Sequence, residues 1–319
     1  MCGVTVCGSM CGVTVCRSMY GVTVCGSMSG ETGPSVCGSM FRVTVCEFMY
    51  GVIVCLPMIG VRARRVNPDT ARLSRDQGQF TLISGHKTDP GFLLHHFLSY
   101  YLKAGCSVCV VSLTQSFNHY SVIAQKLGVS LSCARDRGQL HFLEGLRCFT
   151  RLLFADSAEL EAENPLRFLR NGSDLRPLYN FITAALAPPA GGEWKCPVLI
   201  IDDVSVLLSL GVTSVQVLDF IHYCRAGVCS RYQGNVVCLV QGDEGSEDAE
   251  YELLLRSLCH QSGLILQVEG LVTGFCKDVH GELTITRRTH NTERPVTYQY
   301  KIHDKSVSFF ARGLSAAVL

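Results

Sequence analysis

The clearest hydrophobic pattern in the chain is an apolar run from Val198 to Ile201 that ends at two carboxylates, Asp202 and Asp203. A run of β-branched and leucine residues without polar alternation is typical of a strand buried on both faces, as in a parallel sheet covered by helices. Ligands of open α/β sheets bind beyond the carboxyl ends of such strands. The two acids therefore either belong to a Mg²⁺–nucleotide site or simply end the strand and cap the following turn.

Strands and helices alternate strictly from Gly78 to Glu269. Short apolar runs predict the strands, and apolar stripes at helical spacing predict the helices between them. The predicted strands are 80–84, 107–113, 140–143, 198–201, 235–241 and 264–269, and the predicted helices are 92–103 and the stripes around Tyr120, Leu178, Val217 and Leu254. This order predicts a parallel, doubly wound α/β sheet with right-handed crossovers.

The C-terminal segment has a different period. Residues 282–287, 296–302 and 306–311 alternate between apolar and polar side chains and are separated by turn-forming residues. A period of two predicts half-buried strands. We therefore expect antiparallel strands at one edge of the parallel sheet.

The first 58 residues follow a nine-residue repeat, Gly-Val-Thr-Val-Cys-Gly-Ser-Met, with degraded later copies and all 7 methionines of the chain. This period is shorter than that of helical solenoids, and the segment has few aromatic residues to fill a core. We predict a low-complexity, disordered extension over 1–58, a basic linker over 59–77 and a folded domain over 78–319. A mitochondrial presequence in the linker is a weaker alternative.

Composition narrows the possible partners. The chain has 319 residues, a net charge of +1 and 47% hydrophobic residues. This length allows one large α/β domain, and a charge near zero gives no global attraction to nucleic acid. The apolar stretches fall short of the roughly 20 residues that a membrane span needs, so no membrane partner is predicted. The ten cysteines after residue 58 suit a reducing cytosol.

The turn from Ser84 to Phe92 stands where a nucleotide-binding protein has its P-loop, between a strand and a helix. A working P-loop reads Gly-x-x-x-x-Gly-Lys-Ser/Thr, in which backbone N–H groups and the Lys hold the phosphates and the hydroxyl holds Mg²⁺. Counted from Gly85, Pro90 replaces the second Gly, Gly91 replaces the Lys and Phe92 replaces the hydroxyl residue.

The remaining loop residues do not restore this chemistry. Lys87 and Thr88 come several residues too early, and Asp89 places a negative charge where the triphosphate would lie. We predict no catalytic residue, no cofactor and no metal. The degenerate P-loop position comprises Gly85, Lys87, Thr88, Pro90 and Gly91, with Asp202 and Asp203 as its Walker-B-like acids. In the alternative hypothesis, the chain is a divergent ATPase in which Lys87 binds the nucleotide.

Two further residue pairs could suggest a metal site. Cys106 and Cys109 lie on one predicted strand, where residues three apart point to opposite faces, so buried reduced thiols are the better interpretation. His95 and His96 are adjacent on a helix and diverge by about 100°, which argues against a shared ligand.

The candidate RNA contacts lie in the C-terminal strands. They are Arg287, Arg288, Lys301 and Lys305, with aromatic residues between them. Aromatic side chains on strands of period two are more often core than base-stacking platforms. The acidic residues that follow Gln241 would repel phosphate, so we expect only modest RNA contact by this chain.

Several stretches resemble the family of the sixth Elongator subunit. They are Gly78–Lys103, Leu127–Ser130, Arg137–Leu146, Val198–Gly211, Asp219–Arg225, Leu271–Gly281 and Tyr298–Ala311. The resemblance covers residues 78–319, whereas residues 1–77 match nothing in that family. It implies a RecA-like fold without functional nucleotide motifs.

The resemblance also implies partners and a role. The fourth, fifth and sixth subunits of that family form a heterohexameric ring, which binds tRNA and assists the catalytic Elongator subcomplex in modifying the wobble uridine at carbon 5. We therefore expect a non-catalytic ring subunit in the cytoplasm, with the nucleus as a second location. The alternatives are the divergent ATPase and a pure protein–protein adaptor without RNA contact.

Overall fold

The computed structural model describes residues 78–154, 164–171, 174–187, 194–242, 248–271, 274, 276–288 and 295–311. All of them belong to one compact unit, Phe41–Leu319, and the other unit, Met1–Met40, lies wholly outside the described residues. The predicted repeat extension 1–58 and basic linker 59–77 also lie outside them and stay predictions.

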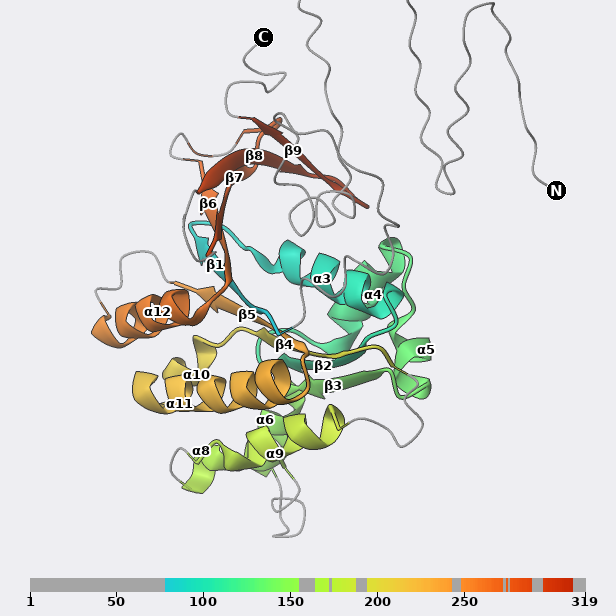
Figure 1. Ribbon diagram of the computed structural model, residues 1–319, viewed down its shortest axis with the longest axis vertical. Coiled ribbons are helices and arrows are strands. Elements are labelled where there is room, and N and C mark those ends of the chain that lie inside the picture. The colour runs from blue at the N-terminus through green and yellow to red at the C-terminus, as the bar shows by residue number, and fades with distance from the viewer. Residues whose placement is uncertain are drawn as a thin grey trace, which may run out of the picture. The chain divides into compact units, whose positions relative to one another are not determined.

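The described residues form one mixed sheet of nine strands in the order β3-β2-β4-β5-β1-β6-β7-β8-β9 (Figure 1). The first six strands are parallel: β1 (Phe80–His86), β2 (Ser107–Ser112), β3 (Leu140–Glu144), β4 (Pro197–Asp202), β5 (Asn235–Gln241) and β6 (Leu264–Gly270). The last three are antiparallel: β7 (Gly281–Arg287), β8 (Val296–Ile302) and β9 (Val307–Ala311). The predicted α/β class, a mostly parallel sheet flanked by helices with antiparallel C-terminal edge strands, is confirmed.

Alternation along the central strands divides the core in two. Val198 and Ile200 of β4 face one layer, and Leu199 and Ile201 face the other. All four side chains are at most 1% exposed. An apolar run without polar alternation is therefore explained by a strand that needs apolar side chains on both faces.

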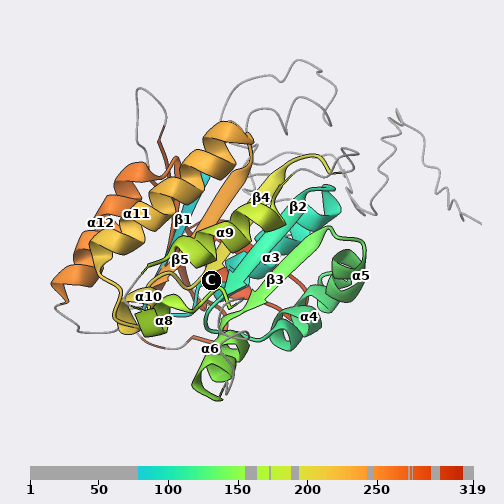
Figure 2. The ribbon, with the colours of Figure 1, turned by 90° about the horizontal axis from the view of Figure 1, so that it is seen from below.

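Helices cover both faces. On one face lie α3 (Gly91–Lys103), α4 (Phe117–Lys126) and α5 (Leu131–Asp136). On the other, seen from below in Figure 2, lie α6 (Gly145–Phe154), α8 (Phe168–Asn171), α9 (Arg176–Ala185), α10 (Val206–Ser209), α11 (Ser214–Arg225), the π-helix η2 (Ala226–Arg231) and α12 (Ala249–Gln261). Among the described helices, none is long and apolar enough to cross a membrane.

The antiparallel strands do more than extend the edge. They bend over α3 (Figure 1), and the ring of Tyr300 of β8 packs at a tilt against the ring of Phe92, with centroids 5.1 Å apart. Leu283, Tyr300 and Phe309 join the same buried cluster as Phe97 of α3. The half-buried pattern of the tail is thus explained by one face that packs on α3 and another that faces outward.

Candidate functional site

The loop between β1 and α3 is closed by its own side chains. The Oδ1 atom of Asp89 accepts a hydrogen bond of 2.7 Å from the N–H of Gly91, the first residue of α3. The N-terminus of a helix attracts anions because its free N–H groups and the helix dipole point outward. Asp89 therefore occupies with its own carboxylate the position that a phosphate would take.

Pro90 closes the loop from the other side. A Cβ atom on Gly85 would lie only 2.6 Å from Cδ of Pro90, so the ring rests directly on the glycine. The backbone of Lys87 has a positive φ of 58° and its carbonyl packs against Gly270, where a Cβ would lie 2.7 Å away. The side chain of Lys87 is exposed. The geometry of this loop therefore comes from contacts within this chain.

The two acids at the end of β4 have separate environments, and Asp202 lies in a ring of hydroxyls. Its Oδ2 atom accepts a hydrogen bond of 2.7 Å from the Tyr120 hydroxyl and lies 3.3 Å from the hydroxyls of Thr114 and Ser112. Asp202 is only 4% exposed. Burial raises the pKa of its carboxyl group, and the hydroxyl donors partly oppose this rise because they stabilise the charged form.

Asp203 caps the turn. Its Oδ1 atom accepts from the Ser205 N–H at 3.0 Å, the Ser205 hydroxyl at 2.7 Å and the Gln241 N–H at 3.2 Å. These bonds order the entry into α10 and tie β4 to β5. Burial raises the pKa of Asp203 to about 6. The capping interpretation is thus confirmed for Asp203, whereas Asp202 lines a cavity.

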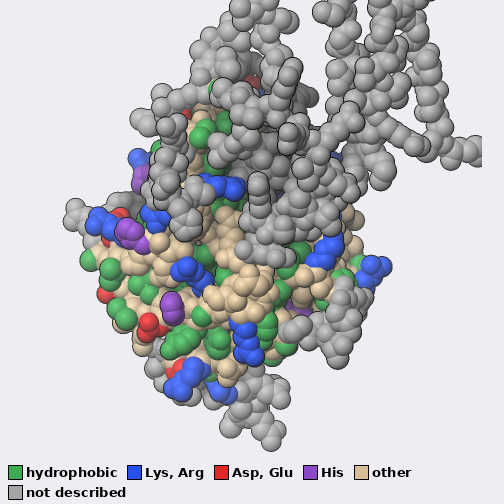
Figure 3. Space-filling model, viewed as in Figure 1, with side chains coloured by type: hydrophobic (Ala, Val, Ile, Leu, Met, Phe, Trp, Pro, Cys, Tyr) green, Lys and Arg blue, Asp and Glu red, His purple; other side chains and the backbone are tan. Residues whose placement is uncertain are grey.

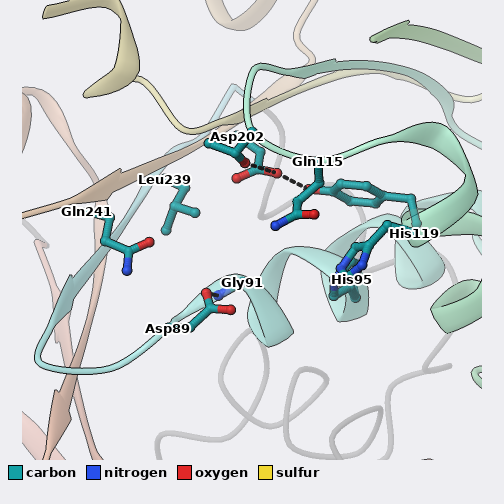
Figure 4. A pocket seen from close by; sticks show the side chains of 10 residues that line it. Asp89, Gly91, His95, Gln115, His119, Asp202, Leu239 and Gln241 are labelled. Carbon is teal, nitrogen blue, oxygen red and sulfur yellow. Dashed lines mark hydrogen bonds between the residues drawn. The ribbon is translucent and has the colours of Figure 1, made fainter. Parts of the chain in front are cut away.

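A cavity of about 230 Å³, which we call the edge cavity, lies between the loop and the hydroxyl ring (Figure 4). Its lining residues are Asp89, Gly91, His95, Thr114, Gln115, His119, Tyr120, Asp202, Leu239 and Gln241. Burial lowers the pKa of His95 to about 3, so this imidazole is neutral at physiological pH. In Figure 4, Asp202 and Asp89 lie on opposite sides of the cavity, and both histidines lie at one end.

Comparison with known proteins places the chain in a family. A profile of the family described as "Elongation complex protein 6" matches residues 66–304. The Elongator complex protein 6 of Xenopus laevis is 66% identical over 259 residues, which cover 80% of this chain and 96% of that protein. The chain belongs to the Elongator complex protein 6 family. The family resemblance noted from the sequence is confirmed.

More distant relatives span a similar length. Elongator complex protein 6 of Homo sapiens is 55% identical, and the matched region covers 79% of this chain and 96% of the human protein. The Dictyostelium discoideum protein of the same name is 22% identical over 74% of this chain and 91% of its own. The family profile begins at residue 66, so the expectation that residues 1–77 match nothing in the family was wrong for 66–77.

One solved structure with a similar chain path is that of an uncharacterized protein from Pyrococcus horikoshii in complex with an unknown peptide. The superposition covers 74% of this chain and 93% of the chain of that protein, with 14% sequence identity and a TM-score of 0.49.

The candidate RNA contacts do not form one patch in this member of the Elongator complex protein 6 family. Arg287 and Arg288 lie where β7 ends, opposite Leu264 at the start of β6, whereas Lys301 and Lys305 lie at the other end of β8. Arg288 donates a hydrogen bond of 2.7 Å to the Cys259 carbonyl, and Lys301 pairs with Asp278 at 2.8 Å. Figure 3 likewise shows the Lys and Arg side chains of one face in separate places.

The pairs considered for metal binding are separated as predicted. Cys106 and Cys109 belong to the buried clusters on opposite faces of the sheet. Of the two adjacent histidines, His95 lines the edge cavity and His96 is not among its lining residues. Within the described ranges, no three His, Cys, Asp or Glu side chains are grouped so as to hold a metal ion.

Sequence reasoning missed most of the cavity wall. Ser112 ends the buried strand β2, the sheet neighbour of β4, and the lining residues Thr114 and Gln115 follow it. A polar cluster directly after a predicted buried strand was a usable signal, because the carboxyl ends of neighbouring parallel strands meet at one sheet edge. His95 and His119 gave no comparable signal, since His95 was considered only together with the adjacent His96 and His119 lies on a different helix.

Proposed function

We propose that this chain is a non-catalytic subunit of the Elongator complex. In this proposal it joins the fourth and fifth Elongator subunits in a heterohexameric RecA-like ring, which binds tRNA and supports modification of the wobble uridine at carbon 5 by the catalytic subcomplex. Membership of the Elongator complex protein 6 family supports the place in the complex. We place this work in the cytoplasm, with the nucleus as a second location.

The observation that carries the non-catalytic role is the hydrogen bond from the Gly91 N–H to the Asp89 carboxylate. A nucleotide would have to displace this carboxylate from the N-terminus of α3 and then lie beside its negative charge. Pro90 has no N–H to offer a phosphate and packs on Gly85. This loop therefore favours a scaffold role over ATP hydrolysis.

An exposed apolar flank supports assembly with other chains. Val215 and Tyr223 of α11 and Leu253 of α12 are between 47% and 61% exposed. The two helices pack side by side on one face of the sheet (Figure 2). Large apolar side chains that gather on one surface often mark a protein contact.

The first experiment re-expresses the full chain in cells that lack it and measures C5-modified wobble uridine in tRNA by mass spectrometry. We expect the wild type and Lys87→Ala to restore the modification equally, and the fourth and fifth subunits to co-purify with both. We also expect the purified chain to bind no Mg-ATP in calorimetric titration. Mg-ATP binding that Lys87→Ala abolishes, together with loss of the modification, would favour the divergent ATPase.

A second experiment separates the tRNA-binding ring from the adaptor. Lys305 is exposed in the turn between β8 and β9, so Lys305→Glu changes charge without breaking a described contact. We expect this reversal to weaken tRNA binding by the assembled ring several-fold, and the matched control Lys126→Glu on α4 to leave it unchanged. Unaltered tRNA affinity in both variants favours an adaptor.

A further inference from the structure

The edge cavity is lined by two carboxylates, and each of them accepts hydrogen bonds through only one of its oxygens. Oδ1 of Asp89 accepts from the Gly91 N–H, and Oδ2 of Asp202 accepts from the surrounding hydroxyls. Within the described residues, neither Oδ2 of Asp89 nor Oδ1 of Asp202 has a hydrogen-bond donor. No Lys or Arg is among the residues that line the cavity in the described part of the chain. Two negative groups therefore lie on opposite sides of the cavity without a Lys or Arg among its described lining residues to pair with them.

A second observation points to a ligand. Asp202 is only 4% exposed and lines the cavity, yet among the described residues its Oδ1 atom has no hydrogen-bond donor. A buried carboxylate oxygen without a donor is costly, so a donor that reaches it from the cavity is favoured. His95 is another lining residue. The His95 ring also lies 4.6 Å from Tyr120 and 5.4 Å from His119, measured between centroids. The two histidines lie at one end of the cavity (Figure 4), and Tyr120 is also among the lining residues.

The charge and shape of the residues that line the edge cavity favour one class of ligand over the others. An anion would meet two carboxylates and no cation. A metal ion lacks a third ligand among the described side chains, since no group of three suitable residues is present there. A neutral ligand would leave both carboxylates uncompensated. A planar cation with several N–H donors can pair with a carboxylate on each side and stack on aromatic rings.

We propose that the edge cavity binds a guanidinium group, with Asp89 and Asp202 as its counter-ions. One of the rings of His95, His119 and Tyr120, whose planes are inclined to one another by 46° to 76°, is its stacking partner. The cavity volume of about 230 Å³ suits such a head group, because pockets for whole drug-sized ligands measure roughly 300–1,000 Å³. The guanidinium group belongs either to a free arginine-like molecule or to an arginine side chain of a neighbouring chain. The binding site itself does not depend on the proposed ring function.

The test titrates the full-length chain with N-acetyl-L-arginine amide in a calorimeter. The matched probe is N-acetyl-L-citrulline amide, which keeps the size and planarity but has no charge, and N-acetyl-L-lysine amide offers a charge without the planar group. We expect saturable arginine binding that is at least tenfold tighter than binding of either other probe. Absence of saturable binding in both the free chain and the complex, or equal binding of the citrulline or lysine probe, overturns the proposal.

Variants locate the site. Asp89→Asn keeps an oxygen for the Gly91 N–H and removes only the charge, and Asp202→Asn does the same inside the hydroxyl ring. We expect each to weaken arginine binding at least tenfold, while Glu252→Gln, an exposed acid on α12, leaves it unchanged. Asp89 is exposed, so its variant decides the matter even where Asp202→Asn does not fold. Unchanged affinity in Asp89→Asn contradicts the proposal.

The assembled complex distinguishes the two sources. A photoreactive p-benzoylphenylalanine in place of His119 at the cavity rim reports what lies in the cavity. If a neighbouring chain supplies the group, the cross-linked peptide contains arginine and the complex no longer binds the probe. If the source is a free molecule, the complex binds the probe as tightly as the isolated chain does. Missing guanidinium binding with intact wobble-uridine modification overturns this inference alone and leaves the proposed function standing.

Discussion

The loop after β1 and the turn after β4 lie at the same edge of the sheet and each places an aspartate on the edge cavity, yet they are held in different ways. Asp89 bonds to a residue two positions along the chain, and Pro90 packs on Gly85 in the same loop. Asp202 bonds to hydroxyls that are 82 to 90 positions away. Local contacts thus close the phosphate position, and long-range packing builds the acid site opposite to it.

The largest expected effect comes from loosening the helix on which the first region depends. Leu98 of α3 is fully buried against the sheet. Leu98→Ala removes this packing and leaves a cavity, so we expect the free energy of unfolding to fall by about 2–5 kcal/mol. Urea denaturation measures it, with Gln125→Ala on the exposed face of α4 as the control. A loss near zero would contradict the position of α3.

The next effect tests the turn through its pH dependence. The pKa of Asp203 is raised by burial from 3.8 to about 6, so the folded state binds the proton more tightly than the unfolded state does. The resulting stabilisation is full below pH 3.8 and is lost as the pH rises through about 6. At about 1.4 kcal/mol per pKa unit, the loss in the wild type amounts to at most about 3 kcal/mol.

Asp203→Asn isolates this contribution because asparagine keeps an acceptor oxygen but does not titrate. We expect the free energy of unfolding of the variant, relative to that of the wild type, to increase as the pH rises from 4 to 7. Denaturation of both proteins at each pH gives the difference, in which the other titrating groups largely cancel. A difference that stays constant with pH would show that Asp203 keeps its ordinary pKa.

A third substitution weakens the hydroxyl ring. Tyr120→Phe removes the 2.7 Å donor to Asp202 and leaves a buried carboxylate with one partner fewer. Hydrogen bonds to charged groups contribute about 1.5–3 kcal/mol, so we expect a loss of that order near neutral pH. Tyr223→Phe, at a tyrosine that is 61% exposed, serves as the control. Equal stability of the two variants would mean that the ring does not hold Asp202.

A smaller effect tests the loop closure. Gly85→Ala places a methyl group 2.6 Å from Cδ of Pro90, so the loop must move at a cost of about 1–3 kcal/mol. Gly263→Ala is the matched control, because its methyl group would lie 3.9 Å from the nearest atom. Thermal denaturation of the two variants compares them directly. No difference between them would mean that Pro90 does not rest on Gly85.

The same contrast explains what could be predicted from the sequence. The missing P-loop groups at Pro90, Gly91 and Phe92 could be recognised because a phosphate loop uses neighbouring residues. The parallel strands followed from apolar runs such as Val198–Ile201. The hydroxyl ring could not be predicted, because Tyr120 approaches Asp202 only after α4 has packed on the sheet. The spacing of residue types along the chain does not indicate such a long-range contact.

Short elements were missed for a related reason. The helix α5 has 6 residues and α10 has 4, too few to show a helical stripe. The antiparallel strands pack on α3 through contacts between residues far apart in the chain, such as that of Tyr300 with Phe92. Whether a half-buried strand continues a flat sheet or folds over a helix is decided by such contacts rather than by its own period.

The smallest expected effect separates the charge of Asp89 from the shape of its loop. Asp89→Asn keeps the hydrogen bond to the Gly91 N–H, so we expect the free energy of unfolding to change by less than about 0.5 kcal/mol. If the negative charge alone excluded phosphate, the variant would bind Mg-ATP in calorimetric titration. We expect no binding, because Pro90 still packs on Gly85 and the positions of the P-loop Lys and hydroxyl residue still hold Gly91 and Phe92. Measurable Mg-ATP binding by Asp89→Asn would show that the loop is blocked by a single charge and otherwise remains competent for a nucleotide.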